Sequence, residues 1–272
     1  MKRTGSPAYD HRQHAGNQGD VVKHVALIAA LQTTLEETQE IPFRYTDAYA
    51  GPSGSMLMPG GEWQCGVGRI DRTRSIRSPH VRTWLQWYLP RPALLGTRYP
   101  GSALIASDLA ADAGKELLLR LWDTSGSVVS ELRAFFGKSA VTEGAVCPSA
   151  RSVVHADFLF VDPPSAASRW NVLLKLLQQG RHLLAWLPVN VAVVDGSTRV
   201  SKLAEKQLRA AMDLEGVRAT KVLWAQGGRT IGCHLLYRIS PRATAAVRQA
   251  VAEVVRLSCW SRQEVEHFDE PL

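Results

Sequence analysis

The sequence is poor in the features that define several large classes of protein. Its four cysteines stand alone, so no Cys-x-x-Cys pair indicates a zinc ribbon or a redox motif, and reduced structural thiols are expected. No run approaches the roughly 18 apolar residues that a membrane span needs. Lys2 and Arg3 are followed by no apolar stretch, which argues against a secretory signal. We therefore expect a soluble, cytoplasmic protein. There is no internal repeat.

The composition is that of an ordinary globular protein with an excess of positive charge. The 272 residues are 45% hydrophobic and 21% charged, which suits one large α/β domain or one domain with an insertion. Lysine and arginine number 32 against 25 acidic residues, a formal net charge of +7. This excess favours a polyanionic partner such as nucleic acid.

The most informative stretch is Asp157–Ser165, with the sequence DFLFVDPPS. Its apolar run predicts a short buried strand of a parallel sheet, which ends at the prolines because proline cannot donate to the ladder. Asp162, Pro163 and Pro164 then fall at the carboxyl end of a strand, where open α/β sheets bind ligands. The alternative is an ordinary turn with a solvated Asp162.

Strands alternate with helices along the chain, which predicts a doubly wound, mostly parallel α/β sheet with one antiparallel edge. The antiparallel part comes from a hairpin between strands at 219–224 and 232–239. We assign residues 1–54 and 99–260 to this domain, 55–98 to a helical insertion, and 261–272 to a disordered or loosely docked tail.

The insertion combines arginines with aromatic residues. Arg69, Arg72 and Arg74 precede an aromatic cluster at 84–88. This combination is typical of a surface that contacts RNA. The alternative is a small helical cap whose tryptophans fill its own core.

Three further segments carry candidate binding residues. Asp20 is predicted to be the N-cap of a helix, and Lys23 in the first turn opposes the helix dipole, so it is a ligand-binding candidate or a solvated lysine. A strand ending at Asp47 leads into small residues around Gly51, which allow a nucleoside to approach the backbone, although the G-x-G-x-x-G fingerprint is missing. Asp123 ends the next strand, where an acid can bind ribose hydroxyls.

Taken in order, these segments resemble the RlmJ family of bacterial 23S ribosomal RNA adenine-N6 methyltransferases. The matching blocks span residues 9 to about 240 and are Tyr9-x-His11-x-x-His14-Ala15-Gly16-Asn17 through Asp20 to Lys23-His24, Asp47-x-x-Ala50-Gly51-x-x-Gly54, Tyr99-Pro100-Gly101-Ser102 and Asp162-Pro163-Pro164. The resemblance implies a Rossmann-like methyltransferase fold with a helical insertion, S-adenosylmethionine as cofactor, and ribosomal RNA as partner. It requires no metal.

The resemblance also implies roles for particular residues. Asp162 and the Pro163 carbonyl would accept hydrogen bonds from the target amine, and the loop with Tyr9, His11 and His14 would fold over the active site. Asp123 would bind the ribose. The other residues that would line the cofactor are Lys23, Asp47, Gly51, Ser102, Glu143, Gly144 and Asp162.

The chain departs from the family pattern at the substrate end. The family has an aromatic residue after the second proline, which stacks on the target base, whereas this chain has Ser165; Trp170 is a candidate ring from the next helix. Tyr49 also stands where the family has histidine. Three hypotheses follow: an RNA adenine-N6 methyltransferase, a divergent methyltransferase acting on a small-molecule amine or another non-RNA substrate, and a non-catalytic relative that binds RNA or a partner protein.

Overall fold

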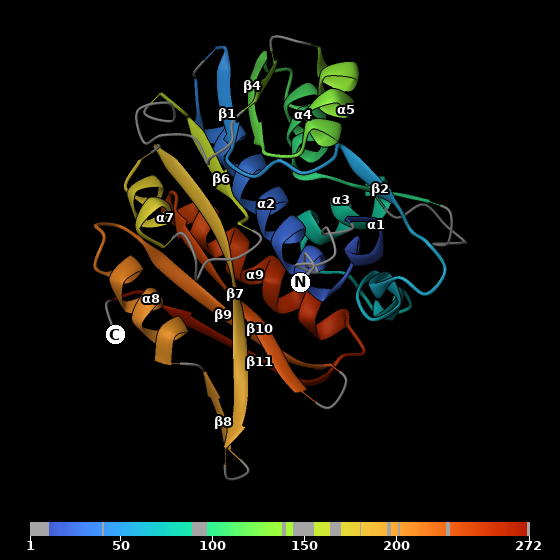
Figure 1. Ribbon diagram of the computed structural model, residues 1–272, viewed down its shortest axis with the longest axis vertical. Coiled ribbons are helices and arrows are strands. Elements are labelled where there is room, and N and C mark those ends of the chain that lie inside the picture. Colours follow the sequence, from blue (N-terminus) through green and yellow to red (C-terminus); the bar gives the residue numbers. More distant parts are fainter. Residues whose placement is uncertain are drawn as a thin grey trace, which may run out of the picture.

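A twisted sheet forms the frame of the molecule, with helices packed on both of its faces (Figure 1). The computed structural model of the protein describes residues 11–39, 41–88, 97–137, 140–143, 155–163, 170–179, 181–194, 197–200, 202–226 and 229–270.

The main sheet has the strand order β11-β9-β10-β7-β6-β1-β4-β5, with β8 (Ser197–Val200) paired to β7. Neighbouring strands are parallel through β7 (His182–Val194), β6 (Phe158–Val161), β1 (Phe43–Asp47), β4 (Leu117–Asp123) and β5 (Val141–Glu143). β10 (Arg229–Arg238) runs antiparallel between β7 and β9 (Arg218–Gln226). The predicted doubly wound sheet with an antiparallel hairpin is confirmed.

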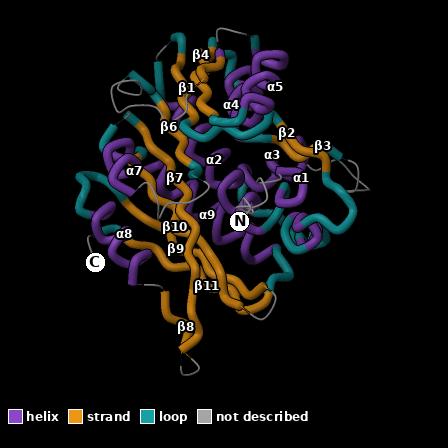
Figure 2. The backbone as a smooth tube through the Cα atoms, in the orientation of Figure 1, coloured by secondary structure: helices purple, strands orange, loops and turns teal. Residues whose placement is uncertain are grey.

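Helices lie on the two faces of this sheet (Figure 2), and a hydrophobic core fills the space between the sheet and the helices on each face. Side chains alternate along each strand, so Phe158 and Phe160 of β6 belong to the first core, while Leu159 and Val161 belong to the second. The first core takes the apolar residues of α2 (Gln18–Glu37), α4 (Ser102–Asp112), α5 (Gly126–Phe136) and α9 (Pro241–Leu257). The second takes those of α7 (Trp170–Leu177) and α8 (Lys202–Met212).

Helix α9 was not predicted from the sequence, although its signals are present. Ser240 caps the helix by accepting a hydrogen bond from the Ala243 N–H at 3.1 Å, and Pro241 follows it in the first turn. The helix buries Val247, Val251 and Val254 at helical spacing. α9 packs against α2, which is itself buried over most of its length.

The prediction of a loose tail is wrong for residues 261–268. Ser261–Phe268 forms β11, which pairs antiparallel with β9 at the edge of the sheet. The Lys221 ammonium lies 2.7 Å from Glu264 and 2.5 Å from Glu266, so the acidic residues that suggested a tail instead pair with a lysine of the adjacent strand. The predicted antiparallel edge is therefore present, with β11 as its outermost strand and the hairpin one strand further in.

The insertion is closed by two short strands, β2 (Gly54–Met56) and β3 (Arg98–Pro100), which pair antiparallel. Between them lie two 3-10 turns, Glu62–Gln64 and Val67–Arg69, and helix α3 (Pro79–Tyr88). Trp84 of α3 is fully buried in the first core. The buried Glu253 of α9 accepts hydrogen bonds from the backbone N–H groups of Arg77 and Ser78. The insertion therefore packs on the main core.

Candidate active site

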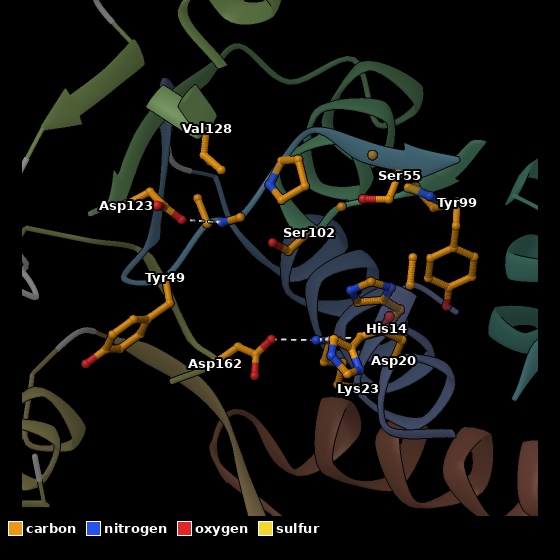
Figure 3. Close-up of a pocket in the computed structure, with 18 of the residues that line it drawn as sticks. His14, Asp20, Lys23, Tyr49, Ser55, Tyr99, Ser102, Asp123, Val128 and Asp162 are labelled. Carbon is orange, nitrogen blue, oxygen red and sulfur yellow. Dashed lines mark hydrogen bonds and ion pairs between the residues drawn. The ribbon is translucent and has the colours of Figure 1, made fainter. Parts of the chain in front are cut away.

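A cavity of about 1240 Å³ opens at the carboxyl ends of the parallel strands. Its walls come from the loops after β1, β4 and β6, the start of α2, the turn between β3 and α4, and the N-terminal segment around His14 (Figure 3). This is the edge at which open α/β sheets bind ligands, and it is where the sequence places Asp162.

Lys23 joins the two sides of the cavity (Figure 3). Its ammonium lies 2.5 Å from Asp162 Oδ2 at the end of β6 and 2.7 Å from Asp20 Oδ1 on α2. Burial alone would lower the pKa of Lys23, but the charges of Asp162 and Asp20 outweigh it and raise that pKa well above its usual value. Lys23 is thus a partly buried cation held by two carboxylates, which excludes the solvated alternative.

The start of α2 differs from the predicted cap. Asn17 is the N-cap, with its Oδ1 accepting a hydrogen bond from the Asp20 N–H at 2.9 Å. Asp20 lies one turn inside the helix and accepts a hydrogen bond from the Gly16 N–H at 2.8 Å. This reciprocal pair resembles a capping box, and it fixes Asp20 where it can hold Lys23.

Asp47 lies behind the cavity wall and not on it. Its carboxyl group is fully buried and accepts hydrogen bonds from Ser102 Oγ at 2.5 Å and from the Tyr49 N–H at 3.1 Å. Ser102 and Tyr49 do line the cavity. Burial raises the pKa of Asp47 to about 7, although the hydrogen bonds from Ser102 and Tyr49 oppose the shift. Asp47 therefore positions two lining residues.

Replacement of Asp47 with asparagine should remove a pH dependence of stability. The folded-state pKa of Asp47 is raised from 3.8 to about 7. The native state therefore binds this proton more tightly than the unfolded state does. As the pH rises between these two pKa values, the free energy of unfolding of the wild type should fall by about 1.4 kcal/mol per pH unit relative to that of Asp47→Asn. Urea unfolding of both proteins at pH 5 and pH 8 measures this. A constant difference between them at the two pH values would contradict the assignment.

Asp123, the last residue of β4, organises the loop after β1. Asp123 Oδ2 accepts a hydrogen bond from the Gly51 N–H at 3.1 Å, and its Oδ1 accepts one from the Ser125 N–H at 2.7 Å. Gly51 has a φ of +60°, which favours glycine. A Cβ on Gly101 would lie 2.2 Å from the Pro52 carbonyl oxygen, so only glycine lets this loop pack on the start of α4. Gly51, Ser102 and Asp123 line one half of the cavity together.

The insertion holds the N-terminal wall of the cavity through Glu62. Its Oε2 accepts a hydrogen bond from Asn17 Nδ2 at 3.0 Å, and its Oε1 lies 3.1 Å from His14 Nδ1. The backbones also meet, because the Val67 N–H donates to the Gly16 carbonyl at 2.9 Å. Glu62 and His14 both line the cavity. The insertion therefore fixes the segment on which the resemblance places substrate contacts.

Substitution of Glu62 with alanine should loosen this wall without unfolding the protein. Loss of two partly exposed polar contacts costs about 1–2 kcal/mol, so the Val67 amide should exchange its hydrogen with solvent roughly 5- to 30-fold faster. Glu62→Gln is the matched control, since its amide oxygen can still accept from Asn17 and should give a smaller change. Unchanged exchange in Glu62→Ala would show that the backbone contacts alone hold the wall.

The other residues predicted for the site either are not described or lie away from the lining of the cavity. Tyr9, Gly144 and Ser165 lie outside the described residues; His11 is in the short helix α1 (His11–His14) and Glu143 in β5, and their side chains are not described. Trp170 begins α7 and packs against the second core. Arg69, Arg72 and Arg74 lie on the insertion, where Arg74 pairs with Asp71 at 3.0 Å. Neither Trp170 nor these arginines are among the residues that line the cavity.

Several lining residues were not predicted as site residues. His24 is 5% exposed and stacks on Tyr99 at 5.4 Å between ring centroids. Burial and the charge of Lys23 together lower the pKa of His24 to about 3, although Asp20 opposes the shift, so its imidazole is neutral at physiological pH. Trp186 of β7 and Glu62 also line the cavity. His24 adjoins Lys23 in the sequence, whereas no local pattern distinguished Trp186 or Glu62.

Within the described part of the chain, no group of His, Cys, Asp or Glu side chains could hold a metal ion. Over the same residues, no helix is long and apolar enough to cross a membrane.

Comparison with known proteins supports the resemblance over part of the chain. No protein-family model matches. The chain is 30% identical over 146 residues to ribosomal RNA large subunit methyltransferase J of Escherichia coli, covering 49% of this chain and 48% of that protein. It is 27% identical over 128 residues to the Haemophilus influenzae protein of the same name, covering 42% of each. The matches thus span about half the length of these curated relatives.

The fold comparison extends over nearly the whole chain. A crystal structure of protein LPL1258 from Legionella pneumophila superposes with a TM-score of 0.70, covering 94% of this chain and 98% of that one at 15% sequence identity. Together with the strand order, this match shows that the chain has a Rossmann-like α/β fold over nearly its whole length.

Proposed function

We propose that the protein is an S-adenosylmethionine-dependent N-methyltransferase whose substrate is the N6 amine of an adenine in ribosomal RNA. The observation that carries the proposal is the position of Asp162 and Pro163 in one cavity with Gly51, Ser102 and Asp123. The cavity thus contains two hydrogen-bond acceptors for an amine, the Asp162 carboxylate and the Pro163 carbonyl. It also contains the loop around Gly51, whose small residues allow a nucleoside to approach.

The residues around Gly51 fit the proposed cofactor. The cavity exceeds the roughly 300–1,000 Å³ of a typical small-molecule site, so a cofactor and a substrate group can meet in it. Asp123 lies at the end of β4, where an acid can accept hydrogen bonds from ribose hydroxyls. Ser102, His24 and Lys23 line the same space. Tyr49 and Pro52 stand on the wall and leave the cavity open.

The charge of the cavity also suits a cationic ligand. Among its described lining residues, one is a lysine and five are acids: Asp20, Glu62, Asp123, Glu131 and Asp162. Acidic walls attract a sulfonium cation, and they lose this attraction once the methyl group has left and the sulfur is neutral. They also repel phosphate, so we expect RNA phosphates to stay outside while one base enters.

The substrate half supplies the groups that an aromatic amine needs. Such an amine is a poor nucleophile because its lone pair is delocalised into the ring. Acceptors for its two N–H groups, here the Asp162 carboxylate and the Pro163 carbonyl, favour the pyramidal form and aim the lone pair. S-adenosylmethionine, when bound, supplies an electrophilic methyl group. Transfer would join the amine nitrogen to that methyl carbon, leave the carbon–sulfur electron pair on sulfur, and release one amine proton to solvent.

Three observations favour RNA as the substrate. The net charge of +7 favours a polyanion. Both curated relatives are named as ribosomal RNA methyltransferases. The insertion carries the exposed Arg69 and Arg74, and through Glu62 it contacts the segment that bears His14. A base in a duplex would have to be flipped out, whereas an unpaired base is captured at lower cost.

Ser165, which lacks a stacking ring, favours the second candidate function, methylation of a small-molecule amine.

Transfer of a labelled methyl group separates the two candidates. The protein is incubated with labelled S-adenosylmethionine and either protein-free ribosomal RNA or a panel of small aromatic and aliphatic amines. We expect label in RNA, recovered as N6-methyladenine after nuclease digestion. Ser165→Tyr should raise this activity by about 5-fold or more, since a stacking ring contributes about 1–3 kcal/mol. Label in small amines alone, with no gain in Ser165→Tyr, would favour the second candidate.

A further inference from the structure

The indole of Trp186 lies level with the proposed catalytic carboxylate. Val161 of β6 and Ala185 of β7 are partners in the parallel register, so the next residues, Asp162 and Trp186, stand side by side. Because side chains alternate, Asp162 follows Phe160 and Trp186 follows Leu184 onto the face that bears α2. Trp186 is partly exposed and lines the cavity.

Helix α2 holds the indole in place. A Cβ on Gly19 would lie 3.0 Å from Cζ2 of Trp186, so the missing side chain of this glycine makes room for the ring. The Lys23 ammonium lies 5.6 Å from the ring centroid, within the range of a cation–π contact. An aromatic ring fixed in this way can bind a flat ligand with little loss of conformational entropy.

The strand order divides the lining of the cavity into two halves. Gly51 and Asp123 follow β1 and β4, on one side of β6, whereas Trp186 belongs to β7 on the other side. Asp162 stands between the two halves. A ring whose amine reaches Asp162 from outside the cofactor half must therefore extend over β7. Pro188, two residues further along β7, continues the same wall.

We propose that Trp186 is the stacking platform of the substrate half and selects a planar heteroaromatic amine over an aliphatic one. The inference rests on the proposed methyltransferase function. In this proposal the stacking ring comes from β7. The residue after Pro164, which is aromatic in the family that the chain resembles, is Ser165 here and has no ring.

The test compares Trp186→Leu with Trp186→Phe, which keeps a ring. Trp186→Leu should lower kcat/KM for ribosomal RNA by about 5- to 150-fold, while Trp186→Phe stays within about threefold of the wild type. The calorimetric affinity for S-adenosylmethionine should be unchanged in both. A second readout uses short single-stranded RNA containing 2-aminopurine, whose fluorescence should be quenched by the wild type and by Trp186→Phe but not by Trp186→Leu.

The outcomes separate this inference from the function on which it rests. If the wild type neither binds S-adenosylmethionine nor transfers methyl groups, the proposed function fails. If the wild type is active and Trp186→Leu matches it in kcat/KM and quenching, only the role of Trp186 is overturned. Equal losses of cofactor affinity and activity would also overturn that role, because they would show that the indole supports Lys23. Trp186→Met, whose flexible, unbranched side chain can fill an irregular space, replaces Trp186→Leu if the latter does not fold.

Discussion

Alanine at position 162 should lower the rate of methyl transfer by about 10²–10³-fold, the usual cost of removing one electrostatic contact to a reacting group. Asp162 directly follows β6 and is partly exposed at the cavity, so its truncation leaves no void in either core. Single-turnover transfer of a labelled methyl group measures the effect, and near-UV circular dichroism checks the fold.

Asparagine at the same position is the matched control. Asp162→Asn keeps the volume and one acceptor oxygen but loses the charge that faces Lys23 at 2.5 Å. We expect an activity between those of the wild type and Asp162→Ala. If Asp162→Ala unfolds, the carboxylate is structural; if it is folded and fully active, the proposed role of Asp162 in catalysis is wrong.

Removal of the Lys23 charge should produce the largest change in stability. Lys23→Met leaves Asp20 and Asp162 facing one another without the cation that holds both, and breaking a buried ion pair costs about 3–5 kcal/mol. Because the Lys23 side chain is 14% exposed, we expect the lower end of this range at pH 7. Binding of cofactor or substrate should weaken as well, since both proposed halves of the cavity meet at this ammonium.

The loss of stability in Lys23→Met should shrink as the pH falls. In the wild type, burial opposes the ionised form of Asp20, but Lys23, His24 and hydrogen bonds hold the pKa of that carboxyl below its usual value. A carboxyl with a depressed folded-state pKa stabilises the protein above its unfolded-state pKa and loses this contribution as the pH falls. Without Lys23, a proton on either carboxylate relieves their repulsion. The difference in free energy of unfolding between the wild type and Lys23→Met should therefore be smaller at acidic pH.

Urea unfolding of both proteins at pH 7 and pH 4.5 measures this dependence. The control is Lys115→Met, since the Lys115 ammonium donates to the Thr38 carbonyl at 2.8 Å, and its loss should cost about 1 kcal/mol at either pH. An equally small cost for Lys23→Met would show that the pair with Asp162 adds nothing to stability.

The parts of the site that could be predicted are those with a local signal. The apolar run before Asp162 and the prolines after it indicate a strand end, and the structure places Asp162 there. Gly51 and Asp123 were predicted in the same way, from strand ends followed by small or acidic residues. Such residues fall together because the ends of parallel strands meet at one edge of a sheet.

The parts that could not be predicted depend on contacts between distant segments. Asn17 and Asp20 are both good N-caps, and only the path of the backbone decides between them. The contacts of Glu62 with His14 and Asn17 join residues more than 40 positions apart, and no periodic pattern in the sequence predicts such contacts. Trp186 stands in an apolar strand, where a tryptophan is ordinarily a core residue. The acids of β11 suggested a tail because their partner, Lys221, lies on another strand.

Calorimetric titration of the purified protein with S-adenosylmethionine and S-adenosylhomocysteine tests the central claim most directly. A methyltransferase cavity formed by Gly51, Ser102, Asp123 and Lys23 should bind both ligands, with dissociation constants on the order of micromolar, equivalent to about −8 kcal/mol. Asp123→Ala should weaken both. Absence of binding for both ligands would contradict the proposed function and would leave a methyltransferase fold that binds RNA or a partner protein without this cofactor.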